Sequence, residues 1–301
     1  MDFCIVDVFA EDKYTGNPLA VVFGDQVAAL SDVEMQQIAQ EMNYSETTFV
    51  PSLQTQDGGY DVRIFTPKKE LPFAGHPTLG TAYVIQQEMI QQPVERLLLN
   101  LGVGQIPVTW TQAEDGDEML WMQQNPPSFY KVLEIDPVAQ ALSLDSTDID
   151  ERFPIQEVST GVPYIIVPLK SLAGLKQAKI DLIAYNHLIQ TTNTTEILIF
   201  SAEPYSPEND ISARVFAPNL GIAEDPATGS ANGCLAAYLV HHQYFDQNSA
   251  QMGQQGLEIQ VEQGYEINRP SILGLKARNV EDRIQVMVGG KVVKVAAGQL
   301  L

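Results

Sequence analysis

Apolar residues recur along the chain with a period near 3.6 in some segments and near 2 in others, which predicts alternating helices and strands. In the segment 31–43, SDVEMQQIAQEMN, the apolar side chains fall on one helix face, and Ser31 and Glu34 have the spacing of a capping box. The stretches TTFVP and YDVRIFTP follow as predicted strands, with QTQDGG as the turn between them. The pattern therefore predicts a helix followed by two strands.

A second helix is predicted over about 77–90, after an irregular loop. Pro77 suits its first turn, because a backbone N–H has no partner within the helix at that position. The stretch RLLLNLGVGQIPVTW then predicts a hairpin that turns near Gly102 to Gly104.

The second half of the chain repeats this order of elements. DLIAYNHLIQ predicts a helix, and TEILIFSA and ISARVFAP predict strands. A loop at 219–229 precedes a helix over about 230–243. The stretch RIQVMVGGKVVKVAAG predicts a closing hairpin around Gly289 and Gly290.

The two halves also match residue by residue. VRIFTP at 62–67 aligns with ARVFAP at 213–218, and ELPFAGHPTLGTA at 70–82 aligns with EDPATGSANGCLA at 224–236 after a three-residue insertion. The match favours an internal duplication, and two copies are too few for a solenoid. We therefore expect an α+β fold of two similar domains facing each other. The identical pairs are Arg63 and Arg214, Phe65 and Phe216, Pro67 and Pro218, Glu70 and Glu224, Pro72 and Pro226, Gly75 and Gly229, and Ala82 and Ala236.

The composition bounds the class of protein. A chain of 301 residues that is 45% hydrophobic is globular and long enough for two domains. Its apolar runs are too short to span a bilayer, and MDFCIVDVFAED lacks the basic region of a secretory signal. Cys4 and Cys234 cannot form a disulfide framework. We expect a cytoplasmic protein with reduced thiols.

The charge and the motifs exclude several partners. A net charge of −21 repels nucleic acid and anionic membranes. No dinucleotide-binding or Walker-type glycine loop occurs, and His187 and the pair His241–His242 have no ligands at metal spacing. Nucleotide binding is therefore unsupported, and we expect no metal site. A small anionic substrate would need a local site, which free N–H groups at helix N-termini can provide.

The repeated loops can provide such a site. Gly75 and Gly229 each stand immediately before a predicted helix and are followed by a polar residue, His76 or Ser230. Glycine there lets a ligand approach the backbone, and first-turn N–H groups have no partner within the helix. Such donors contribute about 10²–10³ in rate where charge develops in a transition state. The alternative is that both glycines only permit tight turns.

Three further side chains have both a chemical and a structural interpretation. His76, at a helix start, is expected to be neutral, and its alternative is a capping or core role. Asp225 is either a substrate contact or a helix cap. Glu46 lies where a helix passes into an apolar strand, which suits general acid–base catalysis, although most acids are surface charges. Its equivalent in the second half is Ile197, so a single catalytic carboxylate is expected.

Six stretches together resemble the motifs of the PhzF-like family, which is named for the phenazine-biosynthesis isomerase. They are, in order, DVFAEDKYTGNPLAVV, NYSETTFV, RIFTPKKELPFAGHPTLG, TGVPYIIV, RVFAPNLGIAEDPATGSANG and VGGKVVKVAAGQL. The resemblance covers essentially the whole chain, and the combination is more specific than any one motif.

The resemblance implies a diaminopimelate-epimerase-like fold, with two pseudo-symmetric domains that each wrap a mixed β-sheet around a central helix. The central helices would start near residues 77 and 230. The first domain would cover 1–118 and roughly 292–301, and the second 119–291. The placement of the last strand rests on the resemblance alone.

The resemblance also implies a reaction. The family enzyme needs no cofactor, usually forms a homodimer, and isomerises trans-2,3-dihydro-3-hydroxyanthranilate by moving a proton from one ring carbon to another. Glu46 matches its acid–base glutamate, and His76 and Asp225 match its other two polar active-site positions. The residues that match its substrate-holding positions are Gly75, Gly229 and Ser230.

Related enzymes of this fold use two facing cysteines that precede the helix-start glycines. Ala74 and Thr228 occupy those positions here, and residue identity therefore excludes a two-thiol relay. Cys234 is predicted to be a helix residue that faces the protein core. A carboxylate-mediated proton shift on a small cyclic or unsaturated carboxylic acid is the leading hypothesis. The alternatives are a lyase or racemase acting on another small carboxylate, and a non-catalytic binding protein that kept the pocket.

Overall fold

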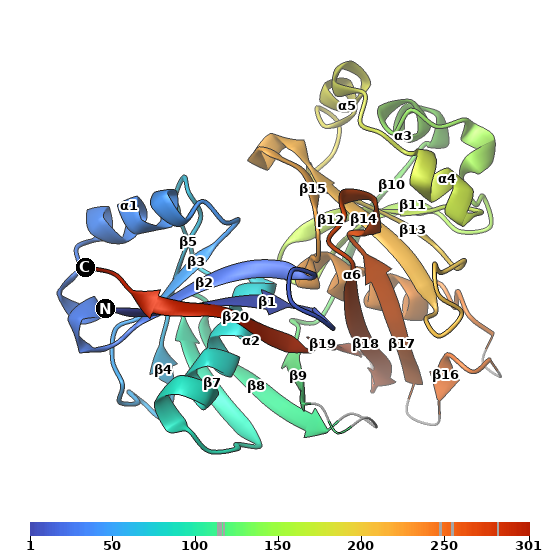
Figure 1. The fold of residues 1–301 in the computed structure, drawn as a ribbon. Helices are drawn as coiled ribbons and strands as arrows, with labels where there is room; N and C mark the ends of the chain where they lie inside the picture. Colours follow the sequence, from blue (N-terminus) through green and yellow to red (C-terminus); the bar gives the residue numbers. More distant parts are fainter. Residues whose placement is uncertain (113–115, 117, 247–248, 254–255, 282) are drawn as a thin grey trace. The chain divides into compact units, whose positions relative to one another are not determined.

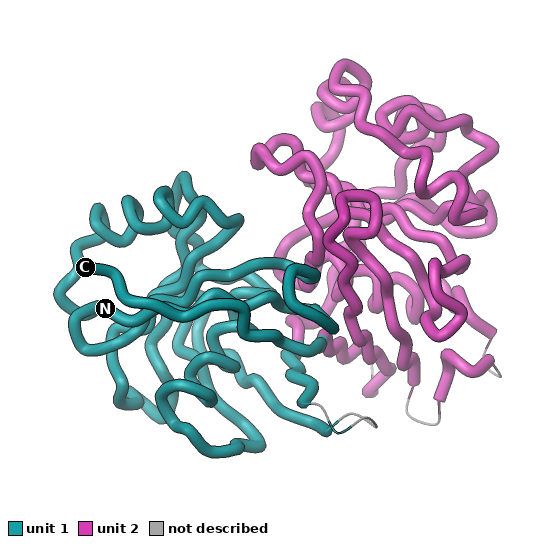
Figure 2. The backbone as a smooth tube through the Cα atoms, viewed as in Figure 1, with its two compact units in different colours: residues 1–123, 289–301 teal, residues 124–288 magenta. Residues whose placement is uncertain are grey.

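The computed structural model describes residues 1–112, 116, 118–246, 249–253, 256–281 and 283–301. The chain divides into two compact units, Met1–Gln123 with Gly289–Leu301, and Gln124–Val288 (Figure 2). The first unit thus contains both ends of the chain, and each unit is described separately below.

One sheet of the first unit has the strand order β20-β1-β2-β3-β5-β6. Neighbouring strands are antiparallel except β2 and β3, which run parallel. The strands are β1 (Asp2–Val8), β2 (Asn17–Phe23), β3 (Thr47–Val50), β5 (Arg63–Phe65), β6 (Glu70–Leu71) and β20 (Val292–Gln299).

Helix α1 (Asp32–Met42) connects the parallel strands β2 and β3 and begins as its sequence predicts. The Ser31 hydroxyl accepts from the Glu34 N–H, and the Glu34 carboxylate accepts from the Ser31 N–H, which is a complete capping box. Met35 and Ala39 are buried against the sheet, where Phe49 and Phe65 belong to the same core cluster.

Helix α2 (Gly75–Val84) is the central helix of the first unit. It packs against β1 and β2 of the first sheet and against β7, β8 and β9, which continue in the order β9-β8-β7-β4. A Cβ on Gly80 would lie 2.7 Å from Leu19 Cδ2 and 2.8 Å from Val8 Cγ2, so the helix lies close to the strands there. A π-helical segment, Ile85–Ile90, extends it. The strands are β4 (Tyr60–Asp61), β7 (Arg96–Leu101), β8 (Gly104–Gln112) and β9 (Glu118–Gln123).

The second unit is built on strands in the order β10-β11-β12-β13-β14-β17-β18, with β19 after β18. The pairs β12–β13 and β14–β17 run parallel, β15 pairs with β14, and β16 pairs with β17. The strands are β10 (Ser128–Leu133), β11 (Ile155–Ser159), β12 (Pro163–Pro168), β13 (Ile197–Ser201), β14 (Ile211–Ala217), β15 (Ile222–Asp225), β16 (Met252–Gly253), β17 (Gly256–Gln263), β18 (Ser271–Val280) and β19 (Arg283–Gly290).

Helix α6 (Gly229–His241) is the central helix of the second unit and packs against β11, β12 and β18 (Figure 1). Cys234, on this helix, is fully buried, as the sequence predicts. A separate core cluster joins three further helices to the sheet. These are α3 (Ile135–Ala141), α4 (Leu172–Gln177) and α5 (Leu182–Leu188). The 3₁₀ turns among the described residues are Asp25–Ala29, Ser146–Asp148, Pro218–Leu220 and Tyr265–Ile267.

The two units share one strand plan. In the first unit a parallel pair, β2–β3, is followed by antiparallel β5 and β6 and then by α2. In the second, the parallel pair β12–β13 is followed by antiparallel β14 and β15 and then by α6. This agreement supports the duplication read from the sequence.

Two expected elements differ in the structure. The stretch YDVRIFTP splits at Val62, because β4 pairs with β7 whereas β5 pairs with β3. The closing hairpin around Gly289 and Gly290 is wrong. Lys291 alone separates β19 from β20, which leaves too few residues for a two-residue hairpin loop, and β20 pairs with β1 instead.

Candidate active site

Two of the expected site residues lie close together in the first unit. Glu46 immediately precedes β3, and His76 is the second residue of α2. Their atoms Glu46 Oε2 and His76 Nε2 are 3.5 Å apart, and the side chains are 14% and 7% exposed. Gly75 begins the same helix turn as His76. The connection between α1 and β3 and the first turn of α2 therefore bring a carboxyl group and an imidazole together.

The imidazole of His76 is neutral. Burial lowers its pKa to about 3, and a hydrogen bond to the Pro18 backbone opposes this only in part. Within the described part of the chain, Nε2 has no hydrogen-bond partner. The bond to the Pro18 carbonyl is therefore donated by Nδ1, and the Nε2 lone pair faces Glu46. The sequence expectation of a neutral imidazole is met.

The second unit holds the other expected residues at the corresponding place. Asp225 is the last residue of β15, and Gly229 and Ser230 begin α6. The Ser230 hydroxyl lies 2.9 Å from the Tyr164 hydroxyl. Tyr164 is buried, which raises its pKa far above the ordinary value, so its phenol keeps its proton.

The N-termini of α2 and α6, like that of α3, lack the side-chain cap that three other helices of the described structure have. Helices α1, α4 and α5 are capped by the side chains of Ser31, Ser171 and Asp181. Neither Ala74 before α2 nor Thr228 before α6 makes a side-chain cap. The first-turn N–H groups of these two helices are thus not occupied by a capping side chain, which suits an anion-binding role.

The N-cap residue of α6 is Thr228, three residues after Asp225. The Asp225 Oδ2 accepts a hydrogen bond from the Thr228 hydroxyl at 2.5 Å. Gln263, at the end of β17, contacts both residues through its side-chain amide. Thr228, Gln263 and Tyr164 were not among the predicted site residues. Tyr164 lies in the stretch TGVPYIIV, but nothing in the sequence pairs Gln263 with Asp225.

The thiols are unsuited to proton transfer. Cys234 is fully buried, and burial raises its pKa to about 12. Burial and the neighbouring Glu88 carboxylate raise the pKa of Cys4 to about 11. Both thiols therefore stay protonated at neutral pH, where only the thiolate is a good base or nucleophile. Among the described residues, no group of three or more His, Cys, Asp and Glu side chains is placed to hold a metal ion.

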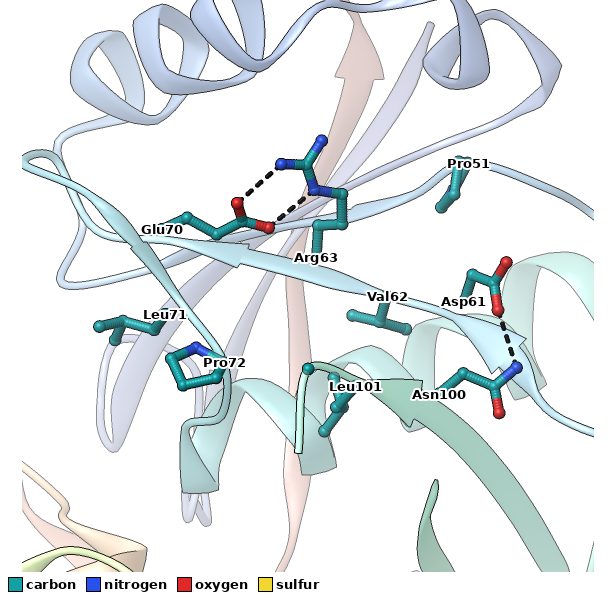
Figure 3. Close-up of a pocket in the computed structure, with 10 residues that line it drawn as sticks. Pro51, Asp61, Val62, Arg63, Glu70, Leu71, Pro72, Asn100 and Leu101 are labelled. Atoms are coloured by element: carbon teal, nitrogen blue, oxygen red, sulfur yellow. Dashed lines mark hydrogen bonds and ion pairs between the residues drawn. The ribbon is translucent and has the colours of Figure 1, made fainter. Parts of the chain in front are cut away.

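A pocket of about 620 Å³ in the first unit lies apart from Glu46 and His76 (Figure 3). Its polar lining is already paired, since Arg63 binds Glu70 through two hydrogen bonds and Asn100 donates to Asp61. No helix in the described part of the chain is both long and apolar enough to cross a membrane.

The fold and the paired helix starts define the diaminopimelate-epimerase-like class of proteins. A probable proline racemase from Agrobacterium radiobacter superposes with a TM-score of 0.64 over 100% of this chain and 92% of its own, at 11% identity, which shows the fold alone. A PhzF-family phenazine biosynthesis protein from Bacillus anthracis superposes with a TM-score of 0.88 at 26% identity, over 100% and 99% of the two chains.

Sequence comparison identifies the family. The model of the phenazine biosynthesis-like proteins, PhzC-PhzF, matches residues 6–298, and the chain belongs to this family of isomerases. It is 34% identical to trans-2,3-dihydro-3-hydroxyanthranilate isomerase of Pseudomonas aeruginosa, over 99% of this chain and 98% of that protein. It is 33% identical to an uncharacterised isomerase of Clostridium acetobutylicum, over 98% and 96% of the two chains.

Proposed function

We propose that this protein is a cofactor-independent isomerase that shifts a proton on a small cyclic or unsaturated carboxylic acid. Its first candidate substrate is trans-2,3-dihydro-3-hydroxyanthranilate, the substrate in the name of the Pseudomonas aeruginosa relative. Glu46 takes the proton from one carbon while the electrons of the C–H bond move into the adjacent unsaturation. Glu46 then returns the proton to another carbon on the same face.

The observation that carries this proposal is the placement of Glu46 against a neutral imidazole. With Nδ1–H bound to the Pro18 carbonyl, Nε2 of His76 can only accept. A protonated Glu46 can donate to that lone pair, whereas an ionised Glu46 cannot. His76 therefore stabilises the glutamic acid that forms when the substrate loses its proton. The separation of 3.5 Å closes to a hydrogen bond with a small side-chain movement.

The helix starts supply the complementary charge. In the first unit, the first-turn N–H groups at Gly75 are suited to hold a carboxylate or the charge that develops on a ring, and in the second unit those at Gly229 and the Ser230 hydroxyl are suited to the same role. Asp225 would orient the substrate through a donor group. In a chain with a net charge of −21, such local donors are needed to attract an anion.

The test is NMR of trans-2,3-dihydro-3-hydroxyanthranilate in D₂O with wild-type protein and Glu46→Gln. We expect conversion with deuterium at the new C–H position, and a loss of at least about 10² in rate in the variant. Glu41→Gln, on the exposed face of α1, is the matched control and should keep the wild-type rate. Undiminished conversion by Glu46→Gln would refute the role of Glu46.

If neither protein converts this compound, the remaining candidates are the lyase and racemase reactions on other small carboxylates. A non-catalytic protein would bind such a compound without exchanging its protons with D₂O. We also propose that the protein is a cytoplasmic homodimer. Sedimentation equilibrium would measure its mass in solution. A monomer at micromolar concentration would contradict that part.

A further inference from the structure

Both N–H groups and the oxygen of the Gln263 side-chain amide are hydrogen-bonded to residues between Asp225 and Asn232. Its Nε2 donates to the Asp225 carbonyl at 2.8 Å and to the Thr228 Oγ1 at 3.1 Å. Its Oε1 accepts from the Thr228 N–H at 3.2 Å and from Asn232 Nδ2 at 2.8 Å. Gln263 is completely buried, so these contacts are not exchanged with solvent.

Two backbone groups fix which way round this amide lies. The carbonyl of Asp225 can only accept, so it must meet the NH₂ group of Gln263, and the N–H of Thr228 can only donate, so it must meet the amide oxygen. The orientation of a glutamine amide usually has to be assigned from its network, and here both ends agree.

This orientation decides where the Thr228 proton goes. Its hydroxyl has one proton, and it already accepts from the Gln263 NH₂ group. The proton is therefore directed to the neighbouring carboxylate, Asp225 Oδ2, 2.5 Å away. The hydrogen bonds thus form a series with one direction: Gln263 donates to Thr228, and Thr228 donates to the Asp225 carboxylate.

Comparison of the two duplicated units indicates that Asp225, Thr228 and Gln263 have a functional role rather than one in forming the fold. The Arg–Glu pair that joins the two strands before each central helix is present in both units. The positions equivalent to Asp225 and Thr228 are Leu71 and Ala74, which cannot hydrogen-bond through their side chains. The strand plan of the first unit therefore forms without this arrangement, and only the second unit has it.

We propose that Thr228 and Gln263 are positioning residues that hold the Asp225 carboxylate in one orientation for the substrate, an inference that rests on the proposed function. Thr228 acts by its hydroxyl proton, and Gln263 acts through Thr228 by occupying the acceptor side of that hydroxyl. Substitutions that remove or reverse this donation should therefore affect Asp225 even when Asp225 itself is intact.

The first test does not depend on turnover. In protein labelled with ¹³C-carboxyl aspartate, the Asp225 resonance is identified by its loss in Asp225→Asn. We expect Thr228→Val to shift this resonance at pH 7 and Thr228→Ser, which keeps the hydroxyl, to restore it. A resonance unmoved by Thr228→Val, or moved equally by Thr228→Ser, would overturn the proposal.

Gln263→Glu tests the direction of this series of hydrogen bonds. A glutamate at 263 keeps the acceptor for the Thr228 N–H but loses the NH₂ donor, so the Thr228 hydroxyl turns toward the new carboxylate. The Asp225 resonance should then shift as in Thr228→Val, although Thr228 is unchanged. A wild-type resonance in folded Gln263→Glu would refute the relay through Thr228, and if this variant does not fold, the two Thr228 variants decide.

The kinetic test follows once a substrate is turned over. We expect Thr228→Val to lower kcat roughly tenfold with KM changed by less than about twofold, because orientation is realised in the transition state. Thr228→Ser should recover most of kcat. An equal loss in both variants, with circular dichroism like the wild type, would contradict the positioning role. Failure to find a turned-over substrate would count against the proposed function and leave the NMR result standing.

Discussion

At the scale of single residues, His76 combines two properties that rarely occur together. It is buried, and it faces a carboxyl group, yet its pKa is lowered to about 3 because burial outweighs every other influence. A histidine beside an ionised carboxylate in water would be expected to gain a proton. The fold instead holds a neutral ring, bound through Nδ1 to the Pro18 carbonyl, as an acceptor for Glu46.

This neutral state predicts how stability depends on pH. The pKa of His76 is about 3 when folded and about 6.5 when unfolded, so between these two pH values the unfolded chain binds this proton and the folded chain largely does not. Stability is therefore complete above pH 6.5 and falls as the pH is lowered, by roughly 2 kcal/mol at pH 5 from this residue. His76→Gln should remove that part of the difference between urea unfolding at pH 7.5 and at pH 5.

The exposed His187 provides the control for this measurement. His187→Gln should keep the full wild-type difference between the two pH values. If His76→Gln also kept it, the imidazole of His76 would not be held neutral in the folded protein, and the acceptor role assigned to it would fail as well.

Sequence reasoning proposes roles for residues that are marked by their local position. His76, Gly75, Gly229 and Ser230 are marked by the start of a helix, and Glu46 by the boundary between a helix and a strand. Side chains that act from distant strands carry no such local mark. Gln263 reaches Thr228 from another strand, and Tyr164 reaches Ser230 in the same way.

At the scale of elements, the duplication preserved a contact as well as a sequence. Arg63 on β5 holds Glu70 on β6, and its guanidinium lies 5.1 Å from the centre of the Phe65 ring. Arg214 on β14 holds Glu224 on β15, 4.9 Å from the centre of the Phe216 ring. Each pair joins the two strands that lead into a central helix.

Replacing the arginine by alanine is expected to lower the free energy of unfolding by different amounts in the two units. Arg214 and Glu224 are each 8% exposed, and the guanidinium also donates to the carbonyls of Leu175 and Ala178. Arg214→Ala leaves a buried carboxylate unpaired and should destabilise the fold by about 3–5 kcal/mol. Arg63→Ala, where the pair is 30% and 44% exposed, should cost about 1 kcal/mol or less.

Urea unfolding of the two variants at pH 7 measures this contrast. Equal losses would mean that burial does not distinguish the two copies. The double variant Arg214→Met with Glu224→Leu should recover part of the stability lost in Arg214→Ala, since an apolar pair leaves no buried charge unpaired.

Periodicity predicted the helices α1, α2, α5 and α6 and several of the strands, but it could not decide which strands pair. Helix α1 carries its own capping box, and the hairpin β7–β8 carries its own glycine turn, so both are set by nearby residues. The strands β19 and β20 follow each other just as closely, yet β20 pairs with β1. The partner of an edge strand depends on residues almost three hundred positions away.

At the scale of the whole molecule, the last strand completes the first unit. Strand β20 covers the edge of β1 that β2 leaves open, along Asp2 to Val8 (Figure 1). The N-terminal amino group of Met1 donates to the Leu300 carbonyl, and the Leu300 N–H donates to the Met1 carbonyl. In the second unit the corresponding place beside β11 is taken by β10, which is the first strand of that unit.

Removal of residues 291–301 should therefore loosen the first unit and spare the second. Without β20, β1 becomes an edge strand with exposed N–H and C=O groups. Peptides from β1 should exchange backbone hydrogen on the order of tenfold faster or more, whereas peptides from β12 and β13 should keep their protection. Removal of the fully exposed Leu301 alone is the control and should change neither. Slow exchange in β1 after the longer deletion would show that the edge is held by contacts other than β20, and equal loss in both units would show that they unfold together.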